Sequence, residues 1–100
     1  MTDEDKLIER IDMEYDLTEG FLGRLREGTF DPVGAQRLLG LLAALDLGDG
    51  PVDRRLVQLL WYMPLLMEWQ KPRLSADDAA AVEQTLNKVI STLERVLGVP

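Results

Sequence analysis

Residues 75–98 read SADDAAAVEQTLNKVISTLERVLG, and this stretch carries the clearest structural signal in the chain. Its apolar residues recur at the three- and four-residue spacing that places side chains on one face of an α-helix. They are Ala79, Val82, Leu86, Val89, Ile90, Leu93, Val96 and Leu97. Ser75 is a suitable N-cap, Asp78 stands at the capping-box position where Glu is more usual, and Gly98 is a typical stop. The pattern predicts an amphipathic helix that must pack against other apolar elements.

Three further helical segments precede this one. The first is predicted over residues 3–26, although Gly20 and Gly23 weaken its last turns and allow a bend or an early end near Gly20. The second begins at Asp31-Pro32, an N-cap followed by a first-turn proline, and ends at Gly48. The third follows the turn at 48–51 and continues to Gln70.

These segments define the predicted fold class. Pro64 lies inside the third helix, where it cannot donate to the carbonyl of Leu60, so a kink or break is expected there. No stretch alternates apolar and polar residues long enough to predict a sheet. We therefore expect an all-α protein whose residues 1–100 form one domain, an antiparallel four-helix bundle with the third helix kinked at Pro64.

Charge is concentrated at the start of the chain. The net charge is −7 over 100 residues, and the first twenty positions hold eight Asp or Glu residues against two Lys or Arg residues. Such a surface disfavours nucleic acid and anionic membranes, because binding to either draws on Lys and Arg. It suits a positively charged protein partner.

The composition also excludes several kinds of site. The chain has no cysteine and no histidine, which removes disulfides, the usual zinc ligands and His-dependent nucleophiles. The glycine spacing and the Lys of a phosphate-binding loop are also missing. From these absences together we expect no cofactor, no metal and no enzymatic activity. The N-terminus lacks the features of a signal peptide, and the longest uncharged stretch, 56–67, is too short to span a bilayer. The sequence therefore predicts a cytoplasmic protein.

Five acids of the first predicted helix share one side and form what we call the acidic ridge: Asp5, Glu9, Asp12, Asp16 and Glu19. In a continuous helix they would fall within an arc of about 80°. The ridge has three interpretations: a solvated helix face, partly neutralised by Arg37, Arg54 or Arg55; a docking surface for a basic protein; or a Ca²⁺ or Mg²⁺ site, which the absence of an EF-hand loop disfavours.

The third predicted helix is apolar on every side. One face would fill the core with Leu56, Leu59, Leu60, Met63, Leu66 and Met67, while the opposite face carries Val57, Trp61, Leu65 and Trp69, with Tyr62 at its edge. If exposed, this second face has the composition of a binding surface or a homodimer contact. Alternatively, Leu17, Phe21 and the loop near Phe30 fold over it and bury it.

The functional hypothesis combines these two surfaces. We expect a non-enzymatic, acidic helical module that binds another protein, for example an inhibitory, immunity-type or regulatory protein acting on a basic partner. Its expected contact residues are Asp5, Glu9, Asp12, Asp16, Glu19, Trp61, Leu65 and Trp69. The alternative is a self-associating structural protein that dimerises through the Trp61/Trp69 face. A small enzyme or ligand-binding protein would instead require a deep polar pocket near Pro64.

Overall fold

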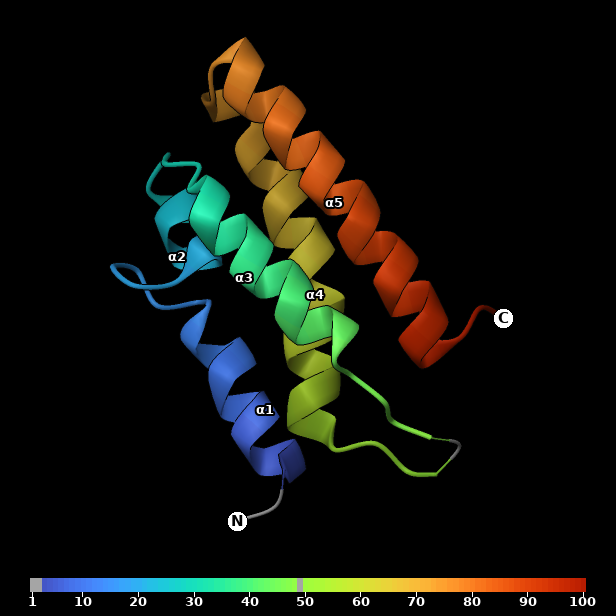
Figure 1. The fold of residues 1–100 in the computed structure, drawn as a ribbon. Coiled ribbons are helices and arrows are strands. Elements are labelled where there is room, and N and C mark those ends of the chain that lie inside the picture. The colour runs from blue at the N-terminus through green and yellow to red at the C-terminus, as the bar shows by residue number, and fades with distance from the viewer. Residues whose placement is uncertain (1–2, 49) are drawn as a thin grey trace.

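The structure, a computed structural model, describes residues 3–48 and 50–100, and all regular structure within these ranges is helical. Figure 1 shows the order of its elements: α1 (Asp3–Met13), α2 (Phe21–Arg26), α3 (Pro32–Ala43), α4 (Arg54–Gln70), the short 3₁₀ helix η1 (Lys71–Arg73) and α5 (Ala76–Leu97). The predicted all-α class is confirmed. Every helix of the described residues is too short or too polar to pass through a lipid bilayer.

The predicted helix starts at Asp31 and Ser75 are also confirmed. The Asp31 carboxylate accepts a hydrogen bond from the Val33 N–H at 3.2 Å, and the Ser75 hydroxyl accepts one from the Asp78 N–H at 3.1 Å. These bonds satisfy amide groups that have no partner within the first turn of a helix. At the other end of α5, Gly98 has a φ of 88°, a backbone conformation that glycine adopts without strain.

The helices surround a single apolar core. α1 contacts α3 and α4, and α5 contacts the same two helices, while α2 packs against α3 and α4. In Figure 1, α1 and α4 run upward and α3 and α5 run downward, with α3 in front and α4 behind. α3 and α4, both described in full, have no Cα atoms within 8 Å of each other. The burial of its side chains divides α4 into a core-facing side, with Leu60 and Met63, and an outer side, with Trp61 and Trp69.

The first helix is shorter than the sequence predicts. α1 ends at Met13, residues 14–20 form turns, and α2 is a separate helix of six residues. The connecting segment doubles back, so that the Glu14 carbonyl accepts hydrogen bonds from the N–H groups of Leu22 and Gly23, at 2.8 and 3.1 Å. The expected continuous helix over 3–26 is therefore wrong.

Two glycines permit this change of direction. A Cβ atom at Gly20 would lie 2.4 Å from the Glu14 carbonyl oxygen, and one at Gly23 would lie 1.9 Å from the Asp16 carbonyl oxygen. Both distances are far inside van der Waals contact. Because these two glycines have no side chain, the turn can approach α2 closely. Close packing of the backbone therefore requires glycine at both positions, in addition to its effect on helix propensity.

Pro64 does not interrupt its helix. α4 continues from Arg54 to Gln70 with Pro64 inside it, so the expected break is not found, and the kink stays a prediction. On the core side, Leu60, Met63 and Met67 are fully buried around the proline. Packing of these side chains offsets the loss of one helical hydrogen bond.

The close approach at Gly23 can be tested against another helical glycine. Gly23→Ala should lower the free energy of unfolding by about 2 kcal/mol or more, because the turn must move to admit a methyl group. Gly40 is the matched control, since it is exposed in α3 and a Cβ there would meet nothing within 4 Å. Gly40→Ala should stabilise the protein by up to about 1 kcal/mol. Urea unfolding followed by circular dichroism measures both, and equal effects would contradict the proposed role of Gly23.

Candidate functional site

The structure separates the five residues of the acidic ridge. Asp5, Glu9 and Asp12 lie on α1, whereas Asp16 and Glu19 lie in the turns that follow it. All five are exposed, as the sequence predicts. The prediction of one helical face is wrong, because the chain leaves the helix after Met13. Only the three α1 residues form an acidic side of a helix.

Asp12 pairs with a cation of the same chain. Its carboxylate lies 2.7 Å from the Arg55 guanidinium at the start of α4, and both side chains are about half exposed. The sequence predicted that Arg37, Arg54 or Arg55 would partly neutralise the acidic ridge. Arg55 does so through its ion pair with Asp12. Among the described residues, no ion pair joins Arg54 or Glu9 to another side chain. The acidic side of α1 is thus only partly compensated.

Asp16 stabilises its own turn. The Asp16 carboxylate accepts hydrogen bonds from the backbone N–H groups of Glu19 and Thr18, at 2.9 and 3.1 Å, and from the Thr18 hydroxyl. The N–H of Glu19, followed by the Thr18 groups, lowers the pKa of Asp16 because each bond favours the charged form. The side chain therefore contributes to the local fold as well as to the surface charge.

An ion pair between a buried carboxylate and an exposed arginine was not anticipated from the sequence. Glu14 is only 3% exposed, and its carboxylate accepts two hydrogen bonds from Arg37 of α3, at 2.7 and 2.8 Å. It also accepts the N–H of Phe21, the first residue of α2, at 3.0 Å. Donation to the Glu14 carboxylate raises the pKa of Arg37, because it favours the charged guanidinium. One signal was available: Glu14 follows Leu7 and Ile11 at helical spacing, which places it in phase with the core face.

The outer face of α4 is exposed. Trp61, Leu65 and Trp69 are 53%, 39% and 56% exposed, and Tyr62 lies between the two indoles with edge-to-face contacts of 5.8 Å between ring centroids. The covering segments predicted as the alternative lie elsewhere. Leu17 is itself exposed, and Phe21 is buried against Phe30. The idea that these residues bury the Trp61/Trp69 face is therefore wrong.

A groove joins the acidic side of α1 to this aromatic face. It is lined by Asp12, Tyr15, Arg55, Gln58, Leu59, Trp61 and Tyr62. The Tyr15 hydroxyl crosses from the end of α1 to donate to the Leu59 carbonyl of α4. Burial of the phenol, followed by repulsion from Tyr62, raises the pKa of Tyr15 because both disfavour the phenolate. Asp12, paired with Arg55, thus borders the same groove as Trp61 and Tyr62.

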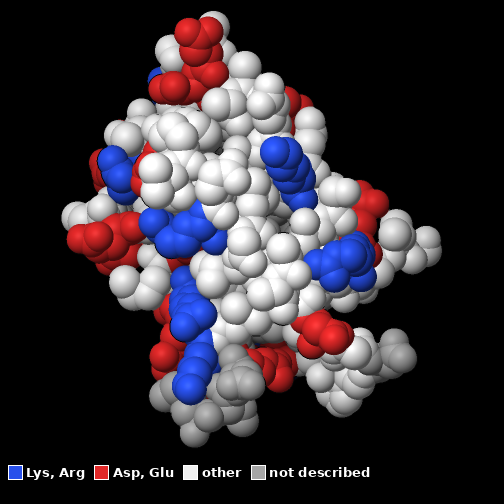
Figure 2. All heavy atoms as spheres, in the orientation of Figure 1, with Lys and Arg blue, Asp and Glu red and all other residues white. Residues whose placement is uncertain are grey.

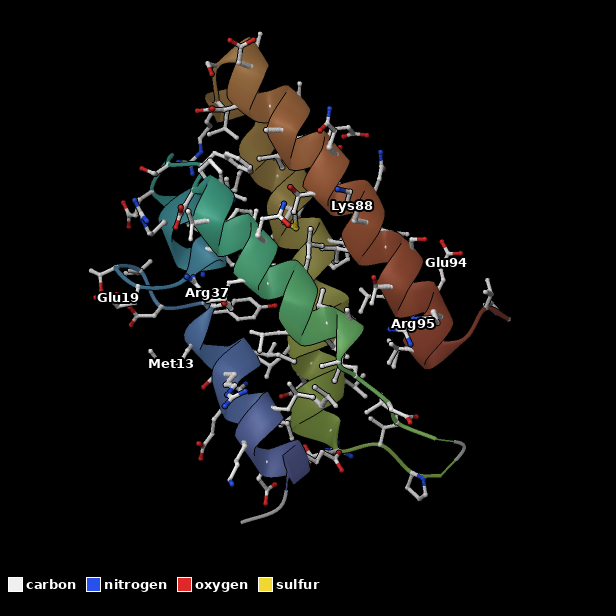
Figure 3. All side chains as sticks on the ribbon, in the orientation of Figure 1. Met13, Glu19, Arg37, Lys88, Glu94 and Arg95 are labelled. Atoms are coloured by element: carbon white, nitrogen blue, oxygen red, sulfur yellow. The ribbon has the colours of Figure 1, made fainter. Side chains whose placement is uncertain are left out.

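The opposite side of α1 differs in charge. In Figure 2, Lys and Arg side chains form a line over α1 and the neighbouring part of α3, while Asp and Glu side chains lie mainly at the margins. A groove of about 460 Å³ is lined by Arg10, Met13, Glu14, Glu19, Arg37 and Leu41. Figure 3 shows Arg37 reaching from α3 toward the segment that carries Glu19. The Glu19 carbonyl accepts a third hydrogen bond from Arg37 at 3.3 Å.

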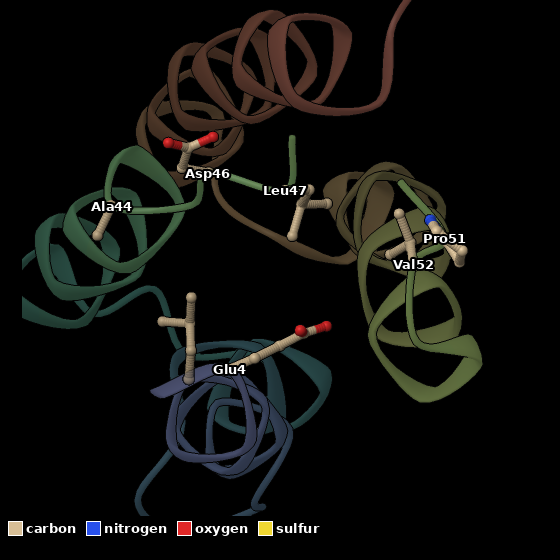
Figure 4. Close-up of a pocket in the computed structure, with 7 residues that line it drawn as sticks. Glu4, Ala44, Asp46, Leu47, Pro51 and Val52 are labelled. Carbon is tan, nitrogen blue, oxygen red and sulfur yellow. The ribbon is translucent and has the colours of Figure 1, made fainter. Parts of the chain in front are cut away.

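A smaller hollow lies at the end of the helices where α1 begins (Figure 4). Its volume is about 210 Å³, and it is lined by Glu4, Leu7, Ala44, Asp46, Leu47, Pro51 and Val52. Two carboxylates border it, from Glu4 and Asp46. Within residues 3–48 and 50–100, no three acidic side chains gather in an arrangement that could hold a metal ion.

Comparisons with protein-family models, with curated proteins and with solved structures find no match.

The ion pair of the buried Glu14 carboxylate can be compared with the exposed pair of Asp12 and Arg55. Glu14→Gln should lower the free energy of unfolding by about 2 kcal/mol, because Arg37 and the Phe21 N–H lose a charged acceptor. Asp12→Asn removes the exposed pair with Arg55 and should cost no more than about 1 kcal/mol. Denaturant unfolding at neutral pH measures both, and a Glu14 variant as stable as the Asp12 variant would refute the structural importance of the buried carboxylate.

Burial of Tyr15 predicts a loss of stability at alkaline pH. Because the fold raises the pKa of Tyr15 above its ordinary value of 10.0, its stabilising contribution is complete below pH 10.0 and declines as the pH rises further. The free energy of unfolding should therefore fall more steeply above that pH in the parent protein than in Tyr15→Phe. Urea titrations across the alkaline range measure both slopes, and parallel curves would show that Tyr15 is accessible to solvent.

Proposed function

We propose that this chain is a non-enzymatic helical module that binds another protein through the acidic side of α1 and the outer face of α4. The observation that supports the proposal best is the shared groove, in which Asp12 and Trp61 border the same surface. Exposed aromatic residues beside charged ones are typical of protein contacts. Trp61, Leu65 and Trp69 would supply the apolar contacts.

The proposed partner is a basic protein. Asp5, Glu9 and Asp12 would attract it, and the exposed carboxylates of Asp16 and Glu19 would add to the negative field although they lie off the helix. Inhibitory or immunity-type proteins that cover a basic active site have this combination of small size and acidic surface. Neither nucleic acid nor a membrane is proposed as a partner, and the cytoplasm is the proposed compartment.

Packing around Pro64 supports a binding role over an enzymatic one. An enzyme of this size would need a polar cavity near the proline, and the neighbouring inward side chains of Leu60, Met63 and Met67 are fully buried instead. The contacts of α1 and α5 with both α3 and α4 support a four-helix bundle with one extra short helix, in which α1 is antiparallel to α3 and α4 is antiparallel to α5. We retain this architecture, with a kink of α4 at Pro64, as part of the proposal.

Self-association is the second candidate function. The exposure of Trp61, Leu65 and Trp69 favours it, since an apolar face of this kind can also be covered by a second copy. Such a dimer does not require a basic partner, so the two functions can be tested separately.

Affinity purification from the native host at low and high salt tests the main proposal. The tagged protein should capture a basic protein at about 0.05 M salt and lose most of it at about 0.5 M, because salt screens exposed charges. Glu9→Lys should reduce capture at low salt while leaving the fold intact, since Glu9 is exposed on α1.

Glu94→Lys is the matched control. Glu94 is exposed on α5, on the side away from α1 in Figure 3, and its reversal changes the net charge equally. Capture should persist with this variant. A partner that resists high salt, or that responds equally to both reversals, would contradict recognition through the acids of α1.

A further inference from the structure

Five residues on the outer face of α4 are spaced evenly about Trp61. Val57 and Leu65 lie four residues to either side of it, and Arg54 and Glu68 lie seven residues to either side. At helical spacing these five residues, which we call the α4 stripe, fall within an arc of about 80°. Along the helix the stripe reads cation, apolar, Trp, apolar, anion.

We propose that the α4 stripe binds a second copy of this chain, with the two α4 helices antiparallel and a two-fold axis at Trp61. This arrangement places Arg54 opposite Glu68 of the second copy and Val57 opposite Leu65 of the second copy. Trp61 meets its own counterpart at the axis. A two-fold contact requires a patch that is complementary to itself, and the stripe has this property.

The side chains of the stripe are available for such a contact. Trp61 and Leu65 are 53% and 39% exposed, Val57 is half-buried, and Arg54 and Glu68 are exposed. Each member therefore reaches the surface, although the apolar ones also pack on their own helix.

The charged ends of the stripe can pair between copies. Arg54 forms no ion pair among the described residues. Glu68 binds Lys71 at 2.9 Å through Oε1, which leaves Oε2 able to accept from Arg54 of the second copy. The apolar centre of the contact would lie between two such charged pairs, as in interfaces with an apolar core and a polar rim.

The order of charges selects this orientation. A parallel contact in register would place Arg54 against Arg54 and Glu68 against Glu68, and like charges facing each other destabilise an interface. A different protein could bind the stripe whatever the order of its residues. Only a second copy of this chain requires the stripe to be complementary to itself. The symmetry is what a second copy of the same helix requires.

The contact between copies rests on the second candidate function, self-association, and gives it a register; it does not depend on the proposed binding of a basic protein. The stripe includes none of the α1 acids, so Glu9 stays outside the contact between copies. Trp61 belongs to both surfaces, whereas Glu9 belongs only to the first. Variants at Glu9 and at Arg54 therefore separate the two ideas.

Light scattering coupled to size exclusion, over a dilution series, measures the oligomeric state of the full chain. The parent protein should be a dimer that dissociates on dilution. Trp61→Glu places two carboxylates at the axis and should weaken the dimer at least about tenfold. Ile90→Glu is the matched control on α5. Ile90 is also an exposed apolar residue, 39% exposed like Leu65, but it lies outside the stripe, so this variant should leave the dimer intact.

A charge exchange tests the antiparallel register. Arg54→Glu alone brings two carboxylates together at each end of the contact, and Glu68→Arg alone brings two cations together, so each should weaken the dimer. The double variant Arg54→Glu/Glu68→Arg restores opposite charges and should recover most of the parent affinity. Circular dichroism of each variant confirms that the helices are retained.

Three results would overturn the inference: a parent protein that stays monomeric at the highest soluble concentration, a dimer unaffected by Trp61→Glu, or a double variant no better than its single parents. If the parent is monomeric while salt-sensitive capture through Glu9 persists, only the dimer fails. If the dimer behaves as expected and no basic protein is captured, only the proposed function fails.

Discussion

The carboxylate of Glu14 connects three elements of this structure. It is buried, and it accepts two bonds from Arg37 on α3 and one from the N–H of Phe21 at the start of α2. A carboxylate removed from water is stable only when charged or polar donors surround it. The positions of α2 and α3 relative to the end of α1 therefore depend on these donors, and so does the direction in which the acidic side of α1 faces.

Periodicity predicted most of the fold because apolar spacing and capping residues act locally. The stripe of α5, its cap at Ser75 and the start of α3 at Asp31 all depend on neighbours within one or two turns. The end of α1 could not be predicted in this way. It depends on Glu14 meeting Arg37, 23 residues later, and on Gly20 and Gly23 admitting another part of the backbone. Such long-range contacts leave only indirect signs in a sequence, such as an acid in phase with a core face.

The candidate site was predicted only in part, because it too depends on contacts between residues that are far apart in the sequence. Exposure of Trp61 and Trp69 follows from the packing of α4, which meets α1, α2 and α5 while the side chains of its outer side stay exposed among the described residues. The sequence left this question open because a helix that is apolar all round fits either a buried or a half-covered position. The acidic ridge failed as a helical face once α1 ended at Met13. Its charge stayed at the surface, but its geometry changed.

The charged ends of the α4 stripe bear on solubility as well as on contact. A two-fold contact uses the same patch on both copies, so it closes at two and leaves no free apolar end, whereas a head-to-tail contact would continue into a chain of copies. Arg54 and Glu68 bound the apolar part of the stripe on both sides, which limits how far another helix can slide along it without placing a charge against an apolar side chain. The stripe thus favours a contact of defined register over non-specific aggregation. This specificity matters for a protein with two exposed tryptophans, because exposed apolar surface otherwise promotes aggregation.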